Sequence, residues 1–162
     1  MSKTLKSKQV AVIGLGTFGV AVLLNKAGYE VLAIDKSIER VESIGPQVTH
    51  AVRADATNEA ALQKLGLTGF DVVVVTVGES IQDSVMITIL LNKLGVKYIV
   101  ARAENELHGD ILNHIGANKV IFPERDTALR TGPVLTMRGV VDFIPLENGS
   151  GIVKARATPY FV

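Results

Sequence analysis

Short apolar runs alternate with helix-forming stretches along most of the chain. Strands are expected at residues 10–13, 31–34, 49–54, 70–75, 98–101 and 119–122, and helices at 18–27, 37–43, 59–65, 80–94 and 105–115. Residues 72–75 are consecutive valines, which leave no polar face and suit a strand covered by helices on both sides. The alternation predicts an α/β fold with a doubly wound parallel six-stranded sheet of order 3-2-1-4-5-6.

The pattern changes after Pro123. Residues 124–130 have a helical composition, but Gly132 and Pro133 follow them, and a proline inside a helix costs about 3 kcal/mol or more. We therefore expect a kink or a restart at this point. Residues 140–146 and 152–155 alternate like the two strands of a hairpin. A C-terminal helix and hairpin thus extend the expected sheet.

A glycine-rich turn follows the first expected strand. Gly14 allows a tight turn, Gly16 lets the backbone approach a phosphate, and Gly19 lets the next helix pack closely on the strand. Thr17 and Phe18 lie where this helix begins. Its unpaired N–H groups and positive dipole end favour a pyrophosphate.

An acidic residue ends the second expected strand. Asp35 stands about 20 residues after the turn, where a carboxylate accepts from a ribose hydroxyl and repels a 2′-phosphate. The glycine motif is weak evidence by itself, so the prediction of a Rossmann-like nucleotide-binding unit depends on strand, helix and acid together. The alternative for Asp35 is a surface ion pair with its neighbour Lys36.

The N-terminal stretch allows a second interpretation. Lys3, Lys6 and Lys8 precede an uncharged run at residues 9–25, as they would in a signal peptide or membrane anchor. The run contains three glycines, lacks an Ala-x-Ala site and is shorter than the ~20 residues that span a bilayer. We expect no membrane-spanning segment here.

Glycine or polar residues follow the apolar runs at their carboxyl ends. Ligands of doubly wound sheets bind at these ends, so we expect one shared site. The candidate ligand-binding residues are Gly14, Gly16, Thr17, Phe18, Gly19, Asp35, Lys36, Asp55, Ala56, Thr57, Thr76, Val77, Gly78, Glu79 and Arg102. Two of them have simpler alternatives. Arg102 could be only a solvated strand end, and Glu79 could be only a negative charge that the dipole of the next helix stabilises.

Composition narrows the class of protein. The 162 residues allow one sizeable domain, and the 48% hydrophobic but 5% aromatic content fits aliphatic, doubly covered strands. The net charge of +1, without a basic block after the first residues, argues against nucleic-acid binding. The absence of cysteine excludes disulfides and thiolate chemistry and fits a reducing cytoplasm. The spacing of His50, His108 and His114 supports neither a metal site nor a catalytic triad.

The expected helix at residues 80–94 has more apolar positions than one sheet face requires. A helix that covers a sheet needs an apolar arc of about 100°. The surplus side is expected to meet another subunit, or else to be covered by the C-terminal part of the same chain.

The chain resembles the cytoplasmic regulators of Trk/Ktr potassium uptake systems, whose nucleotide-binding lobe is the N-terminal (TrkA-N) part of the RCK domain. The resemblance covers about residues 8–146. Its carriers are residues 11–19, Asp35, residues 55–57, 77–79, 102–103, His108, Leu112, residues 116–121 and 123–125.

This resemblance implies a non-catalytic gating subunit. Residues 1–139 would form the nucleotide-binding domain, and 140–162 the start of a second lobe. Such proteins form homodimers arranged as an octameric ring on a membrane potassium channel subunit, at the inner face of the cell membrane. They bind ATP, ADP or NAD(H), and ring shape changes with the ligand.

The resemblance also assigns roles to residues. Residues 16–19 would hold phosphates, Asp35 the ribose, Asp55 and Thr57 the adenine side, and Arg102 the distal phosphate or ribose. Many relatives that sense a triphosphate have arginine in place of Thr17, so ADP or NAD(H) is as good a candidate here as ATP.

A divalent cation is a further implied ligand. Glu124 would supply a carboxylate near the dimer axis, although a cap for the following helix is an equal alternative. One carboxylate makes a site only with oxygens from phosphates or a second subunit.

An NAD(P)-dependent oxidoreductase, or its detached cofactor domain, is the rival function. Hydride transfer requires a substrate pocket and an acid/base group beside the nicotinamide. The sequence contains no Tyr-x-x-x-Lys pair or paired histidine and carboxylate in that region, which favours the sensor.

Overall fold

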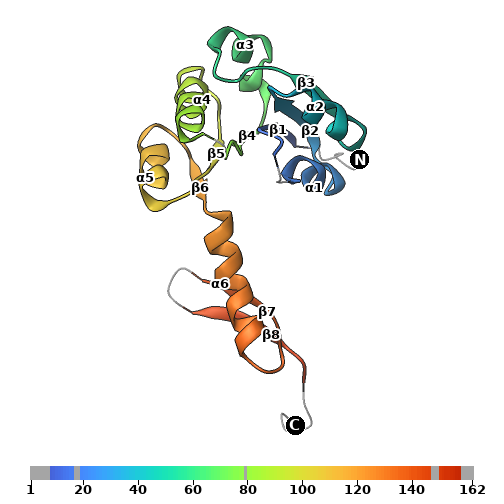
Figure 1. The fold of residues 1–162 in the computed structure, drawn as a ribbon, viewed down its shortest axis with the longest axis vertical. Helices are drawn as coiled ribbons and strands as arrows, with labels where there is room; N and C mark the ends of the chain where they lie inside the picture. Colours follow the sequence, from blue (N-terminus) through green and yellow to red (C-terminus); the bar gives the residue numbers. More distant parts are fainter. Residues whose placement is uncertain (1–7, 17–18, 79, 147–149, 158–162) are drawn as a thin grey trace, which may run out of the picture. The chain divides into compact units, whose positions relative to one another are not determined.

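The computed structural model describes residues 8–16, 19–78, 80–146 and 150–157 (Figure 1). The chain forms two compact units, Met1–Ile121 and Phe122–Val162, and each is considered by itself. The expected domain of residues 1–139 remains a prediction.

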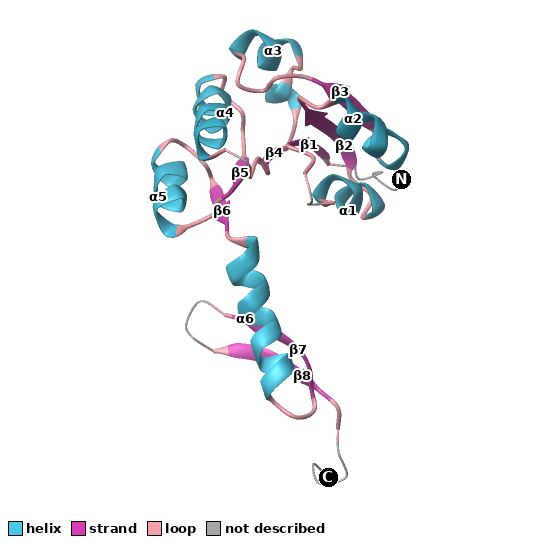
Figure 2. Ribbon diagram, viewed as in Figure 1, coloured by secondary structure: helices cyan, strands magenta, loops and turns pink. Residues whose placement is uncertain are grey.

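Unit 1 is an α/β sandwich with parallel strands. Its strands are β1 (Gln9–Ile13), β2 (Glu30–Asp35), β3 (His50–Arg53), β4 (Val72–Val75), β5 (Ile99–Arg102) and β6 (Lys119–Ile121). Its helices are α1 (Val20–Lys26), α2 (Ile38–Ile44), α3 (Glu59–Lys64), α4 (Ile81–Lys93) and α5 (Glu106–His114), with short 3-10 turns η1 (Gly45–Gln47) and η2 (Leu67–Gly69) (Figure 2). The sheet order is β3-β2-β1-β4-β5-β6, which confirms the predicted topology.

Side-chain caps begin most of these helices. Ser37, Asn58, Ser80 and Asn105 each accept a hydrogen bond from the backbone N–H three residues later. Such caps satisfy one of the unpaired donors at a helix start. The helix expected at residues 18–27 is α1, which begins at Val20 with Gly19 at its N-cap position and ends at Lys26; residues 17 and 18 lie outside the described part.

The core lies around the central strands. Ala11, Val12, Val73 and Val75 have no exposed surface, and Ile13 is 2% exposed. The run of valines is therefore covered on both faces, as expected of a central parallel strand. Burial of each such aliphatic side chain stabilises the fold by about 1.5–3 kcal/mol.

The N-terminal apolar run is a strand of this core. β1 pairs with β2 on one side and β4 on the other. This position contradicts the membrane-anchor interpretation of residues 9–25. Within the described residues, no helix combines the length and apolarity required to cross a bilayer.

Unit 2 consists of α6 (Pro123–Thr136) and an antiparallel hairpin, β7 (Val140–Pro145) and β8 (Gly151–Ala155). The hairpin confirms the expectation for this stretch. Arg130 on α6 forms a bidentate pair with Asp142 on β7, with both N–O distances at 2.9 Å. This guanidinium lowers the pKa of the Asp142 carboxyl.

Of the kink or restart expected at Gly132 and Pro133, the restart is wrong, and the kink stays a prediction. One helix continues through both residues to Thr136, and the N–H of Met137 bonds to the carbonyl of Pro133 at 2.9 Å. Pro133 lies in the last turn of α6. Its missing N–H and its ring therefore disturb only the turn before it, and no long stretch of helix follows that could be disturbed.

Candidate functional site

A cavity of about 290 Å³ opens in unit 1 at the carboxyl ends of β1, β2, β4 and β5. Most of the predicted ligand residues line it: Gly14, Gly16, Asp35, Lys36, Asp55, Ala56, Thr57, Thr76, Val77, Gly78 and Arg102. Ile13, Arg40, Ala54, Asp83 and Ile87 complete the lining. The topology thus collects residues from distant parts of the sequence into one crevice.

Gly14 makes the tight turn that the sequence predicts. Its φ is 94°, in the left-handed region, and an added Cβ would lie 2.9 Å from the backbone nitrogen of Val77. Both the conformation and the space therefore require glycine. The N–H of Gly14 donates to the carbonyl of Ile34 at 2.9 Å, which fixes the turn against β2.

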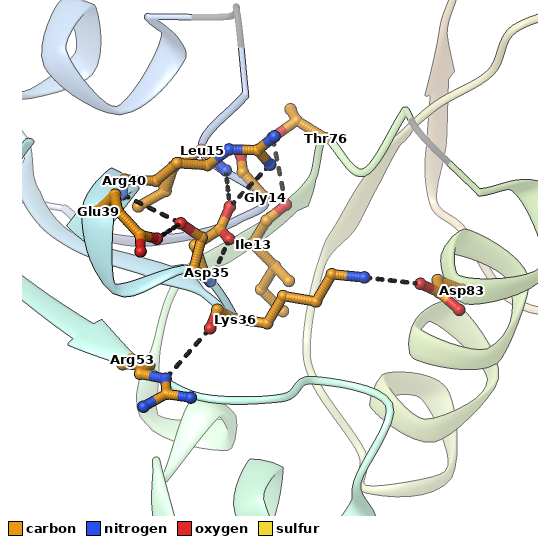
Figure 3. A network of polar contacts seen from close by, with 11 residues as sticks. Ile13, Gly14, Leu15, Asp35, Lys36, Glu39, Arg40, Arg53, Thr76 and Asp83 are labelled. Atoms are coloured by element: carbon orange, nitrogen blue, oxygen red, sulfur yellow. Dashed lines mark hydrogen bonds and ion pairs between the residues drawn. The ribbon is translucent and has the colours of Figure 1, made fainter.

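Thr76, the residue directly after β4, fixes the same turn. Its hydroxyl lies 2.6 Å from the Gly14 carbonyl oxygen and 3.2 Å from that of Ile13, and the side chain is buried. The hydroxyl proton is thus used within the protein (Figure 3). Contact between Thr76 and a ligand stays a prediction.

Asp35 joins the glycine turn to the start of α2. Its carboxylate accepts from the N–H of Leu15 at 2.7 Å and from the N–H of Ser37 at 2.8 Å. Arg40 lies 3.6 Å from the same carboxylate, which is 4% exposed (Figure 3). A carboxylate has about four acceptor positions, so these contacts leave capacity for a ribose hydroxyl.

Lys36 does not pair with Asp35, so the surface ion pair considered for these two residues is wrong. Its ammonium group instead lies 3.5 Å from the carboxylate of Asp83, in the first turn of α4. Figure 3 shows the lysine extended from β2 towards α4. Arg53 donates to the Lys36 carbonyl at 3.2 Å. The ion pair between Lys36 and Asp83 thus connects the two walls of the crevice.

Asp55 and Thr57 form a local turn after β3. The N–H and hydroxyl of Thr57 donate to the same Asp55 oxygen, at 3.0 and 2.7 Å. These bonds lower the pKa of the Asp55 carboxyl, with the hydroxyl as the larger cause. Asp55 is therefore an anion fixed at the crevice wall at neutral pH.

The other two motif glycines have different surroundings. A Cβ at Gly16 would meet no described atom within 4 Å, so the backbone there is open to a ligand. A Cβ at Gly19 would likewise meet no described atom within 4 Å. The expected role of Gly19 in close helix–strand packing is therefore wrong. Thr17, Phe18 and Glu79 lie outside the described residues, and their predicted roles stay predictions.

Sequence reasoning missed Arg40 and Asp83 as lining residues. Both stand in the first turn of a helix that follows a strand of the sheet. First-turn residues of such helices lie at the carboxyl edge, next to the loops that bind ligands. Their place in the first turn of a helix is thus the feature of the sequence that would have identified both residues.

His108 is a buried histidine beside the end of β5. Its side chain is 2% exposed, its Nδ1 accepts from the N–H of Glu104 at 3.3 Å, and its Nε2 has no hydrogen-bond partner among the described residues. Burial lowers the pKa of this imidazole, with Arg102 in the same direction and Glu104 opposing. His108 is thus neutral in the folded protein near pH 7.

Stability is expected to decrease in acid because of His108. The pKa of His108 is lower in the folded protein than in the unfolded chain. Its contribution to stability is therefore complete above the ordinary pKa of about 6.5. This contribution is lost as the pH falls below that value, because the unfolded chain binds the proton first. Urea unfolding between pH 7.5 and 5 should show a steeper loss for the wild type than for His108→Phe. His114→Gln, at an exposed position of the same helix, should keep the wild-type slope; equal slopes in all three proteins would contradict the prediction.

Among the described residues, no group of three or more histidine or acidic side chains could hold a metal ion. Glu124 stands in the first turn of α6, whose N-cap position is Phe122, so its alternative role as a helix cap is wrong. Its cation-binding role stays a prediction.

Comparison with known proteins identifies the family. The TrkA-N domain model matches residues 10–123. The chain belongs to the TrkA-N domain family. It is 40% identical over 156 residues to the Ktr system potassium uptake protein A of Bacillus subtilis, a match that covers 95% of this chain and 70% of that protein. The family predicted from the sequence is thereby confirmed.

Solved structures agree with the fold of this TrkA-N chain. The NAD(P)-binding domain of an exopolyphosphatase-related protein from Archaeoglobus fulgidus is 29% identical with a TM-score of 0.69, and the match covers 79% of this chain and 98% of that one. The GsuK channel bound to NAD is 15% identical with a TM-score of 0.67, and the match covers 90% of this chain and 26% of that one. This second likeness concerns the fold alone.

Proposed function

We propose that the chain binds an adenine nucleotide (ADP, ATP or NAD(H)) and serves as a regulatory, non-catalytic subunit of a Trk/Ktr-type potassium uptake system. The glycine turn beside the crevice carries the proposal. Gly14 bends the backbone sharply, and Gly16 leaves it open next to a cavity that Asp35 also lines. The names of the Ktr system potassium uptake relatives support the assignment to potassium uptake.

The lining residues fit such a ligand chemically. Arg102 supplies a guanidinium suited to phosphate, and the open backbone at Gly16 suits a diphosphate. Ile13, Ala54 and Ile87 provide apolar surface. A diphosphate at the turn and a ribose at Asp35 is the pose that these positions favour.

The proposed assembly is a homodimer within an octameric ring, bound to a membrane potassium channel subunit at the cytoplasmic face. Ile81, Met86 and Ile89 on α4 are 38%, 43% and 41% exposed, as expected of the surplus apolar side of this helix. Nucleotide binding would then shift the ring between conformations through a difference in affinity. A divalent cation at Glu124 is part of the same proposal.

The oxidoreductase alternative receives less support from the crevice. Its described lining includes no histidine or tyrosine to exchange a proton beside a nicotinamide, and Lys36 is paired with Asp83. Turnover of NADH with carbonyl substrates would favour this alternative.

Titration calorimetry with ADP, ATP, NAD and NADH tests the proposal. At least one of these ligands should bind with a dissociation constant in the micromolar range, and GDP should bind much more weakly. Size-exclusion chromatography with light scattering should show a ligand-dependent oligomer. Absence of heat with all four adenine ligands would contradict nucleotide binding.

A further inference from the structure

The guanidinium of Arg102 lies directly against Gly78. An ideal Cβ built on Gly78 would overlap the Nη1 atom of Arg102 and would lie 3.1 Å from its Cζ and 3.7 Å from its Nη2. Gly78 lies in the loop after β4, and Arg102 ends β5, the neighbouring strand. Both residues line the crevice.

Space, and not backbone conformation, makes glycine necessary at position 78. Gly78 is absent from the glycines with positive φ, so its backbone lies outside the left-handed region that favours glycine. Gly14 differs, because its φ of 94° requires glycine. The arginine is therefore the neighbour that a side chain at position 78 would displace.

The displaced group is the far end of a long side chain. An arginine has several rotatable bonds, so it can swing away from a new methyl group without disturbing the strand that carries it. The fold should thus tolerate Gly78→Ala, while the guanidinium should leave its present place. A phosphate bound by the planar fork of that guanidinium would then lose its partner.

We propose that Gly78 is a positioning residue that seats the guanidinium of Arg102 in the crevice for the phosphates of the ligand. The inference rests on the proposed nucleotide binding and deepens it. The contribution of this glycine is the room that it leaves for the arginine. Its effect on the ligand passes through Arg102 and concerns phosphate, not the adenosine part.

A double-mutant cycle measures this coupling. Wild type, Gly78→Ala, Arg102→Ala and the double variant are titrated with ADP and with adenosine. Gly78→Ala should weaken ADP binding about 10- to 100-fold, the loss expected when a charge-assisted hydrogen bond to phosphate is removed. Adenosine affinity should stay within about twofold. In the Arg102→Ala background the alanine at position 78 should have no further effect.

Two results would overturn the proposal. One is an equal loss of adenosine and ADP affinity in Gly78→Ala, and the other is an additive loss in the double variant. Gly69→Ala is the matched control, because a Cβ there meets nothing within 4 Å, its φ is not positive and it lies outside the crevice lining. If Gly78→Ala unfolds, recovery of folding in the double variant supports the contact with Arg102, and unfolding in both contradicts it.

A ligand-free readout separates this inference from the proposed function. The ¹⁵Nε–Hε NMR signal of Arg102, assigned by its loss in Arg102→Ala, should shift in Gly78→Ala and stay in place in Gly69→Ala. An unshifted signal would refute the positioning role even if nucleotides bind. A shifted signal in a protein that binds no adenine nucleotide would preserve the positioning role and refute the nucleotide assignment.

Discussion

Gly14→Ala is expected to destabilise the protein by at least about 3 kcal/mol. A left-handed conformation costs a residue with a Cβ about 1–3 kcal/mol, and here the Cβ would also lie 2.9 Å from the nitrogen of Val77 and 3.1 Å from the carbonyl carbon of Thr76. Those atoms are backbone and belong to the segment directly after β4, so they cannot rotate aside as the end of a side chain can. Urea unfolding followed by circular dichroism measures the loss.

Gly16→Ala is the control for Gly14→Ala. The structure shows no described atom within 4 Å of its added Cβ and no positive φ. Stability should therefore change by less than about 0.5 kcal/mol, the usual range for surface substitutions. Affinity for ADP should nevertheless fall, because the methyl group would occupy the space through which a phosphate approaches the backbone. Equal stability losses in both variants would show that the strain at Gly14 is misassigned.

Asp35→Ala is expected to weaken both the fold and nucleotide binding. The substitution leaves the N–H groups of Leu15 and Ser37 without their acceptor and removes the carboxylate that lies beside Arg40. An unsatisfied buried donor costs about 1–3 kcal/mol, so a total of about 2–4 kcal/mol is expected in urea unfolding. Asp35→Asn should lose nearly as much, because an amide oxygen can replace one acceptor and its NH₂ group then faces the other N–H.

Comparison of ADP with 2′,3′-dideoxy-ADP isolates the ribose role of Asp35 from this structural role. The wild type should bind the dideoxy compound about tenfold more weakly, and the Asp35 variants should bind both compounds equally. The control is Asp71→Asn, since Asp71 also accepts a backbone N–H, that of Gln9, but at the amino end of the sheet. If the Asp35 variants still discriminate between the two compounds, the ribose lies elsewhere.

The arrangement of strands and helices was readable from local sequence. Valine runs without a polar face predict central strands, and Ser37, Asn58 and Ser80 mark the helix starts that the structure contains. The crevice was also predictable in outline, because parallel strands bring their carboxyl ends to one edge. The helix restart predicted at Pro133 was wrong, because the cost of a proline depends on where in a helix it falls.

The contacts inside the crevice were not readable in this way. Lys36 pairs with Asp83 across the crevice, Arg40 approaches Asp35, and Arg102 lies on Gly78. Each contact joins the end of a strand to a different element, and its geometry depends on strand register and side-chain rotamer. A sequence motif predicts which residues reach the edge of the sheet, but it does not predict which of these residues contact one another.

The sequence by itself determined the strand order, the turn at Gly14 and the family, because hydrophobic period, glycine conformation and motif spacing are local properties of a chain. Tertiary structure decided that Asp35 is already engaged by the backbone of the glycine turn, and that Gly78 matters for the space above it. Both depend on how closely atoms from separate strands approach, and close packing leaves no room for one more methyl group at such points.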